Sequence, residues 1–252
     1  LRKPPRLQPL PVLDWGGLAE ETVAREVNVF AIPDRLEFAR AIAFTNSYAT
    51  SATALTWPHL LNVRQGDWLL VHGASGGVGI AAVEIGKILG ATVIATAGSA
   101  QKLDMARAHG ADHVINYRER EFRDEVLALT GGRGVDAVYD PVGGEVFMQS
   151  LRCMAPEARI MPVGFAGGDI PQIPANILLV KNVAAMGFYF GSWRRNRPDL
   201  AAKAFAALDR MVEAGQLKPL VSHRLDLADF RAALELVQTR KSTGKVVLVT
   251  GA

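Results

Sequence analysis

A glycine-rich turn between a short apolar run and a helical pattern constrains the fold more than any other feature of this chain. Residues 72–79 read HGASGGVG and follow the apolar run 68–71. Gly76 lets the backbone approach a pyrophosphate, because a Cβ there would collide with it, and Gly79 lets the following helix pack close to the strand. The N–H groups at the start of that helix can then meet phosphate oxygens. The predicted phosphate-binding residues are Ala74, Gly76, Gly77, Val78 and Gly79.

The rest of the central region alternates apolar, β-branched runs with helical patterns, which is typical of βαβ units. Most of these runs are apolar on both faces, as expected for parallel strands covered by helices. Strands are predicted at 68–71, 92–95, 113–115, 135–139 and 159–163. Helices are predicted from Gly77 to a stop at Gly90, from a Ser99 cap to Ala108, and over Glu121–Leu129. The expected fold class is α/β, a doubly wound parallel sheet of the Rossmann type.

The two ends of the chain have a different character. The front, residues 1–48, is proline-rich and irregular, with a strand-like stretch near Ala19–Val29. The tail has a long amphipathic helix over 200–212, an Asp226/Asp229 capping box and a closing strand at 245–249. We therefore expect a nucleotide-binding domain at 49–189, with 1–48 and 190–252 packed together as a second domain.

Composition excludes several classes of protein. The 252 residues are 49% hydrophobic and 21% charged, with no apolar run long enough to span a bilayer. A net charge of +3 is too small and dispersed to make nucleic acid the main partner, and the basic cluster 194–197 is interpreted as a solvated turn. Cys153 is the only cysteine, so no intrachain disulfide can form. These features, and the absence of a signal-peptide pattern, favour a cytoplasmic protein.

The end of the second predicted strand bears on the choice of coenzyme. NAD-binding sheets place an acidic residue there, about twenty residues beyond the glycine turn, to bind the ribose 2′-hydroxyl. Here the segment is Ala97-Gly98-Ser99, and Lys102 lies one turn into the next helix. Small residues leave room for a 2′-phosphate and Lys102 can supply positive charge, so the pattern favours NADPH; the alternative is a solvated surface lysine.

Short-chain reductases use a similar sheet but require a lysine four residues after a tyrosine. No tyrosine of this chain meets that requirement, because the residues four positions beyond Tyr48, Tyr117, Tyr139 and Tyr189 are Ala52, Glu121, Gly143 and Trp193. The short-chain class is therefore excluded.

Four stretches of sequence carry a resemblance to a known family. They are LLVHGASGGVG at 69–79, ATAGSAQK at 95–102, GADHVINYR at 110–118 and GGRGVDAVYDPVGG at 131–144. Together they resemble the zinc-independent quinone oxidoreductases of the medium-chain dehydrogenase/reductase superfamily, over a span from about Trp15 to the C-terminus. The resemblance implies a Rossmann domain with the remainder of a GroES-like catalytic domain, and NADPH as cofactor.

The resemblance also assigns binding roles to individual residues. Those that match the family's 2′-phosphate site are Ser99, Lys102, Tyr117 and Arg240. Those that match the lining of the nicotinamide end are Thr50, Val142, Val163, Gly164 and Phe165. No catalytic side chain is assigned, since a quinone can accept hydride and take its proton from water. Among the scattered histidines, only His72, beside the glycine turn, merits a test.

The chain differs from the members of this family at three places. Family members begin with a longer segment that forms most of the catalytic domain, so the chain is expected to be a fragment, a processed form or a natural truncation. A Tyr-His pair of the family is replaced by Ala52-Thr53. Zinc-dependent members carry a ligand cysteine four residues before the position of Thr50; this chain has Asn46 there, so no metal is expected.

The favoured function is hydride transfer from NADPH to a quinone or a similar electron-poor small molecule. Two alternatives stay open: an NADPH-dependent reductase of alkenals or enoyl thioesters, and a non-catalytic NADPH-binding relative. The apolar stretch Val183–Phe190 is expected to form the last strand of the sheet. An exposed apolar edge needs a partner, and in the family it pairs with its twofold mate, so a homodimer is expected.

Overall fold

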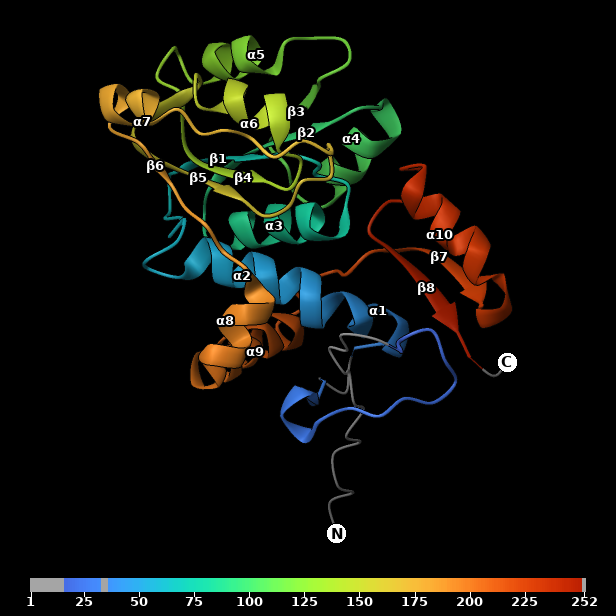
Figure 1. Cartoon of the computed structure of the whole chain (residues 1–252). Helices are drawn as coiled ribbons and strands as arrows, with labels where there is room; N and C mark the ends of the chain where they lie inside the picture. The colour runs from blue at the N-terminus through green and yellow to red at the C-terminus, as the bar shows by residue number, and fades with distance from the viewer. Residues whose placement is uncertain (1–15, 33–35, 251–252) are drawn as a thin grey trace.

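A six-stranded parallel sheet forms the centre of the molecule (Figure 1). The computed structural model describes residues 16–32 and 36–250. The strands lie in the order β3-β2-β1-β4-β5-β6, and their bounds are β1 Trp68–Val71, β2 Thr92–Ala97, β3 His113–Asn116, β4 Val135–Asp140, β5 Met154–Pro162 and β6 Ala184–Ala185. This is the doubly wound order of dinucleotide-binding sheets, so the predicted fold class is confirmed. β5 begins earlier than predicted, at Met154.

Helices cover both faces of the sheet and divide the core into two clusters. On one face lie α3 (Gly77–Ile88) and α4 (Ala100–Ala108), and on the other α5 (Phe122–Leu129), α6 (Gly144–Ser150) and α7 (Ala175–Lys181). Ser99 precedes α4 as predicted, but its side chain makes no capping hydrogen bond. Within the described ranges, no helix is both long and apolar enough to cross a bilayer.

A second helical layer packs outside α3 (Figure 1). It comprises α1 (Phe38–Ala43), a π-helical turn (Phe44–Tyr48), α2 (Ala49–Thr56), α8 (Phe190–Asn196) and α9 (Pro198–Glu213). The hydroxyl of Ser51, on α2, contacts the carbonyl of Val78 at 2.9 Å and the hydroxyl of Tyr139 at 2.8 Å. The helical run 38–56 crosses the domain boundary predicted at residue 49.

The tail forms a small unit of its own. β7 (Val221–Asp226) pairs with β8 (Lys245–Val249), and a 3-10 turn (Leu227–Asp229) leads into α10 (Phe230–Gln238) between them. Asp226 caps that turn through the N–H of Ala228, while Asp229 makes no capping bond, so only half of the predicted capping box forms. Gly244 donates its N–H to the carbonyl of Ser75 at 2.8 Å, which fastens the tail to the glycine-rich turn.

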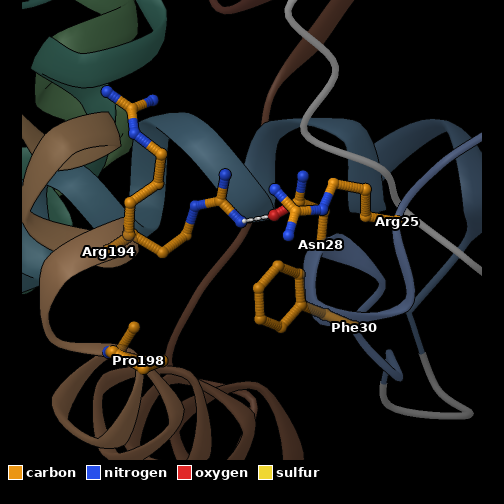
Figure 2. A pocket seen from close by; sticks show the side chains of 7 residues that line it. Arg25, Asn28, Phe30, Arg194 and Pro198 are labelled. Atoms are coloured by element: carbon orange, nitrogen blue, oxygen red, sulfur yellow. Dashed lines mark hydrogen bonds between the residues drawn. The ribbon is translucent and has the colours of Figure 1, made fainter.

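One expectation from the sequence is wrong and two hold only in part. The stretch 19–29 contains a short 3-10 turn (Glu26–Asn28) and no strand, because no strand of the described residues lies beside it to form a ladder. The stretch 183–190 does supply the last strand of the sheet, but only at Ala184–Ala185, because the chain then leaves the sheet and Phe188 and Phe190 pack against Trp193. The cluster 194–197 is solvated except for its first residue: residues 195–197 are exposed, while Arg194 lies in α8 with only 6% of its surface exposed. The guanidinium of Arg194 donates to Asn28 Oδ1 at 2.7 Å, the bond drawn in Figure 2.

Candidate functional site

The glycine-rich turn lies where β1 ends and α3 begins. Gly73 adopts a left-handed backbone conformation, with φ of 55°, which turns the chain out of the strand. A Cβ at Gly79 would lie 2.7 Å from the Cα of Ala74 and would also clash with the Gly73 carbonyl, so only glycine lets α3 sit this close to β1. Ala74 is fully buried and its N–H bonds the Thr96 carbonyl at 3.1 Å. The predicted role of Gly79 in helix packing is therefore seen directly.

A cleft of about 230 Å³ lies over this turn, at the carboxyl ends of β1, β2 and β4. The turn contributes Gly73, Ser75 and Gly76, and more distant segments contribute the rest: Ala97, Gly98, Lys102, Tyr117, Val142, Ala166, Val237, Arg240 and Ser242. Five residues predicted from the sequence thus meet in one cleft, namely Gly76, Lys102, Tyr117, Val142 and Arg240. No acidic residue lines it, which suits an anionic ligand.

Positive charge gathers at the end of the cleft beside β2. The Nζ of Lys102 donates a hydrogen bond of 2.7 Å to the backbone carbonyl of Arg240, so α4 and the end of α10 are joined (Figure 1). The guanidinium of Arg240 donates to the Ala166 carbonyl at 2.7 Å. Burial, and then the charges of Arg118 and Arg240, lower the pKa of Lys102. Cations that repel one another in this way are stabilised by a bound anion.

Arg118 is a member of this cluster that sequence reasoning missed. A Cβ on Gly98 would lie 2.6 Å from the hydroxyl of Tyr117 and 3.1 Å from the Nε of Arg118, so both side chains fold over the end of β2. Glycine at 98 is needed to admit them. The sequence does offer a way to find Arg118, because it directly follows Tyr117 in the stretch 110–118 that resembles the family.

Lys245 is a second residue that sequence reasoning missed. A Cβ on Gly77, the first residue of α3, would lie 2.9 Å from the Oγ of Ser47 and 3.3 Å from the Cε of Lys245. Burial lowers the pKa of the Lys245 ammonium. No hydrogen bond or ion pair joins this ammonium to another described residue. No local pattern singles out Lys245, since only the docking of Gly244 on Ser75 brings β8 to the turn.

Of the residues predicted for the nicotinamide end, Val142 lines the cleft, and Thr50, Val163, Gly164 and Phe165 lie outside its lining. Val163, Gly164 and Phe165 follow β5, and the N–H of Val163 bonds the Asp140 carbonyl at 2.7 Å. Buried Asp140 also accepts the N–H of Val142 at 2.7 Å, which fixes the turn after β4. Thr50 lies in α2, with its hydroxyl 3.5 Å from Asn46 Oδ1. Ser99, Gly77 and Val78 also lie next to the cleft without lining it.

His72 is a buried core residue. It is 1% exposed, with Nδ1 2.9 Å from Thr96 Oγ1 and Nε2 2.8 Å from Ser150 Oγ. Both ring nitrogens are thus satisfied inside the sheet and neither faces the cleft. Burial lowers the pKa of His72, partly offset by the charge of Asp140. A role for His72 in proton transfer has no geometric support.

The buried imidazole predicts a pH dependence of stability. The folded protein holds His72 neutral, while the unfolded chain takes up a proton near pH 6.5. As pH falls below about 6.5 the unfolded state binds the extra proton, so stability should fall by up to about 1.4 kcal/mol per pH unit. His72→Gln keeps polar contacts and should remove this contribution. Denaturant unfolding of both proteins at pH 7.5, 6.5 and 5.5 measures it; parallel losses in the two proteins would contradict the assignment.

No group of three or more His, Cys, Asp or Glu side chains is arranged to hold a metal ion within residues 16–32 and 36–250. Asn46 stands where zinc-dependent members have a ligand cysteine, and it lies in the π-helical turn. Thr50, four residues later, lies in α2. Ala52 and Thr53, which replace the family's Tyr-His pair, are buried in α2. The expectation of a zinc-free protein stays a prediction.

Comparisons with known proteins agree with this geometry. A family model described as "Zinc-binding dehydrogenase" matches residues 77–207. Quinone oxidoreductase-like protein 2 of Bos taurus is 37% identical over 235 residues, which are 93% of this chain and 67% of that protein. The chain therefore spans about two thirds of the length of this relative.

Solved structures give the same family. The Escherichia coli quinone oxidoreductase complexed with NADPH matches with a TM-score of 0.79 and 27% identity, over 88% of this chain and 68% of that one. The CurK enoyl reductase matches with a TM-score of 0.79 and 29% identity, over 89% of this chain and 66% of that one. From its sequence, its strand order and these relatives, the chain belongs to the quinone oxidoreductase family of the medium-chain dehydrogenase/reductase superfamily, and it is an oxidoreductase by descent.

Proposed function

We propose that the protein binds NADPH in the cleft above the glycine-rich turn and passes a hydride to a quinone or a similar electron-poor acceptor, without zinc. The observation that carries the proposal is the convergence of Lys102, Arg118 and Arg240 at the end of β2, where the lining has no acidic residue. A 2′-phosphate adds nearly two negative charges there. NADH has only a hydroxyl at that position and leaves the cations unpaired.

The residues present fit the proposed cofactor along its length. The turn at 73–79 and the N-terminus of α3 provide N–H groups for the pyrophosphate, and glycine at 79 lets that helix begin this close to the turn. Lys102, Tyr117 and Arg240 would hold the 2′-phosphate. Val142 and the segment 163–165 would flank the nicotinamide, which supplies the hydride when the cofactor is bound.

The chain's own contribution to the proposed reaction is orientation and the exclusion of water. The turn after β4 is fixed by the bonds that Asp140 accepts from Val142 and Gly143. Apolar Val142 and Phe165 would limit the faces from which an acceptor can approach. A quinone gains its proton from water after hydride transfer, so the reaction needs no dedicated acid.

The test is an acceptor screen with purified protein. Loss of NADPH absorbance is followed with a set of quinones and, separately, with a set of enals, with NADH in matched reactions. Faster NADPH oxidation with quinones, yielding hydroquinone, is the expected result. Tight NADPH binding without oxidation by any acceptor would replace this proposal with a non-catalytic binding protein.

A second candidate function is reduction of a conjugated C=C bond. It is supported by the likeness to the CurK enoyl reductase, which matches this chain with the same TM-score, 0.79, as the Escherichia coli quinone oxidoreductase. Product analysis separates the two functions, since a saturated aldehyde or thioester appears only if the alkene is reduced.

Lys245 is proposed to contact the pyrophosphate, which NADPH and NADH share. It lies against Gly77 at the start of α3, with its Cε 3.3 Å from the place that a Cβ on Gly77 would take. A hydrogen bond to a charged group contributes roughly 1.5–3 kcal/mol, so Lys245→Met should weaken both coenzymes alike by about tenfold or more. Lys241→Met, at an exposed site of the same tail, is the control. Fluorescence titration that gives unchanged affinities would disprove the contact.

A homodimer through the β6 edge also remains a proposal. β6 ends the sheet and pairs only with β5 within the described chain. Three large apolar side chains near it are strongly exposed, Leu179 by 77%, Val180 by 74% and Tyr189 by 69%. Exposed apolar surface beside an open sheet edge is typical of a subunit contact.

A further inference from the structure

The guanidinium of Arg240 reaches across the cleft to the loop that follows β5, residues 165–168. Its Nη2 donates to the carbonyl of Ala166 at 2.7 Å, and both residues line the cleft. Among the residues that the structure describes, no other hydrogen bond joins the tail, residues 221–250, to this loop. Arg240 thus connects the end of the cleft beside β2 with the segment that follows β5.

The loop 165–168 rests on the turn after β4 through backbone contacts. The N–H groups of Ala166 and Gly167 donate to the carbonyls of Pro141 and Val142, at 3.0 and 2.8 Å. The loop is otherwise open to solvent, and Phe165 at its start is 43% exposed. An exposed segment held by so few hydrogen bonds opens at little cost in free energy, so one further contact changes how often it opens.

Arg240 is fixed at its backbone, while its side chain has donors to spare. It follows α10 in a left-handed conformation, with φ of 57°, and its carbonyl accepts a hydrogen bond of 2.7 Å from Nζ of Lys102. The bond to Ala166 is the only one that its exposed guanidinium makes with a described residue. A guanidinium carries five N–H donors in a planar fork, so most of them remain for a ligand.

We propose that Arg240 binds the 2′-phosphate of NADPH and the Ala166 carbonyl at the same time, so that the phosphate fixes the loop 165–168 beside the nicotinamide. The inference rests on the proposed binding of NADPH and adds an effect of the 2′-phosphate at the far end of the coenzyme. An exposed arginine that bonds only a neutral carbonyl gives up side-chain freedom for a weak contact.

A phosphate between Arg240 and Lys102 changes this balance. Charge-assisted hydrogen bonds hold the guanidinium in place, and the phosphate also offsets the repulsion between the two cations. The bond to Ala166 then persists, and the loop opens less often. NADH lacks the phosphate, so with NADH the loop should open as often as in the free protein.

Hydrogen exchange of the loop, followed by mass spectrometry on the peptide that covers 163–170, tests the proposal without turnover. The probes, both at saturating concentration, are adenosine 2′,5′-bisphosphate and adenosine 5′-phosphate, which differ only in the 2′-phosphate. The bisphosphate should slow exchange of this peptide by about fivefold or more, and the monophosphate should leave it within about twofold of the free protein. The helix α5, on the other face of the sheet, is the internal control and should not change.

Two variants separate this effect from a simple loss of affinity. Arg240→Ala, saturated with the bisphosphate, should lose the slowing at 163–170. Tyr117→Phe removes a hydroxyl that lines the cleft and bonds no residue of the described loop. It should weaken binding of the bisphosphate and keep the full slowing at saturation. Circular dichroism checks that both variants are folded, and the comparison of the two probes on the wild-type protein needs no variant.

The outcomes distinguish this inference from the proposed function. Slowing that persists in Arg240→Ala, equal slowing by the two probes, or equal slowing in α5 would each overturn the effect on the loop and leave NADPH binding intact. Binding of the bisphosphate without any slowing would do the same. If the bisphosphate does not bind, the proposed coenzyme and this inference both fail.

Discussion

Replacing Lys102 and Arg240 together by alanine is expected to raise the dissociation constant for NADPH by roughly tenfold to a hundredfold and to leave that for NADH nearly unchanged. Two hydrogen bonds to a charged phosphate contribute about 3–6 kcal/mol before losses to screening and ordering, and half of that gives the stated range. The two side chains reach one cleft from α4 and from the end of α10. The wild-type protein should accordingly prefer NADPH strongly.

Titration by nicotinamide fluorescence measures both coenzymes on both proteins. Lys241→Ala, one residue from Arg240 but outside the cleft lining, is the matched control and should change neither affinity by more than about twofold. Because Lys102 also bonds the backbone carbonyl of Arg240, Lys102→Ala should by itself produce more than half of the double variant's effect, whereas Arg240→Ala keeps that carbonyl and should cost less. Equal wild-type affinities for the two coenzymes, or equal losses of both in the double variant, would show that these residues do not select the 2′-phosphate.

The part of the site that lies close in sequence could be predicted from the residues alone. The turn 72–79 and the absence of an acid at 97–99 are local patterns, and local patterns fix the strand, the helix and the space for a phosphate. Arg240 lies 138 residues from Lys102, and only the family resemblance connected the two. Lys245 was missed because its position depends on packing between segments, and no periodicity encodes that packing, whereas Arg118 could have been found from its place beside Tyr117 in the stretch 110–118.

The errors in the fold have the same origin. The strand-like stretch 19–29 has the right residue types, but a strand needs a neighbouring strand and none of the described segments provides one. The composition of the basic cluster 194–197 predicts solvated side chains. In the structure Trp193 packs on Trp57 at the end of α2 and Phe190 packs on Phe205, and these contacts bury Arg194 in the same helix. Tertiary contacts override the local preference in both cases.

Glu84 carries the second large expected effect, on stability. It lies in α3 with 5% of its surface exposed and accepts three hydrogen bonds from separate segments. The hydroxyl of Tyr48 donates at 2.7 Å, the Nδ1 of His109 lies 2.6 Å away, and the backbone N–H of Lys218 donates at 3.1 Å. Burial and the Glu84 charge raise the pKa of Tyr48, so that hydroxyl stays protonated and remains a donor. One carboxylate thus joins the π-helical turn, α3, the end of α4 and the segment before β7.

Glu84→Ala should lower the free energy of unfolding by about 3–5 kcal/mol, because it leaves the buried hydroxyl of Tyr48 and the partly buried N–H groups of His109 and Lys218 without their acceptor. In a chain of this length that corresponds to a fall in Tm of roughly 6–20 °C. Glu84→Gln keeps one acceptor oxygen and should cost less. Glu125→Ala is the control, since Glu125 pairs with exposed Arg120 on the surface and such pairs contribute about 0–1 kcal/mol. Denaturant unfolding followed by circular dichroism measures all three.

The same variant tests whether the second helical layer supports the coenzyme cleft. Tyr48 adjoins Ser47, which lies against Gly77 at the start of α3, so loss of the Glu84 contact should loosen the helix end that faces the pyrophosphate. Glu84→Gln, assayed at a temperature where it is fully folded, should therefore weaken NADPH and NADH by the same factor, unlike the Lys102 and Arg240 variants. If Glu84→Ala is as stable as Glu125→Ala, the carboxylate does not join these segments in solution. If Glu84→Gln is destabilised but binds both coenzymes normally, its role is confined to stability, because the cleft then keeps its shape without this support.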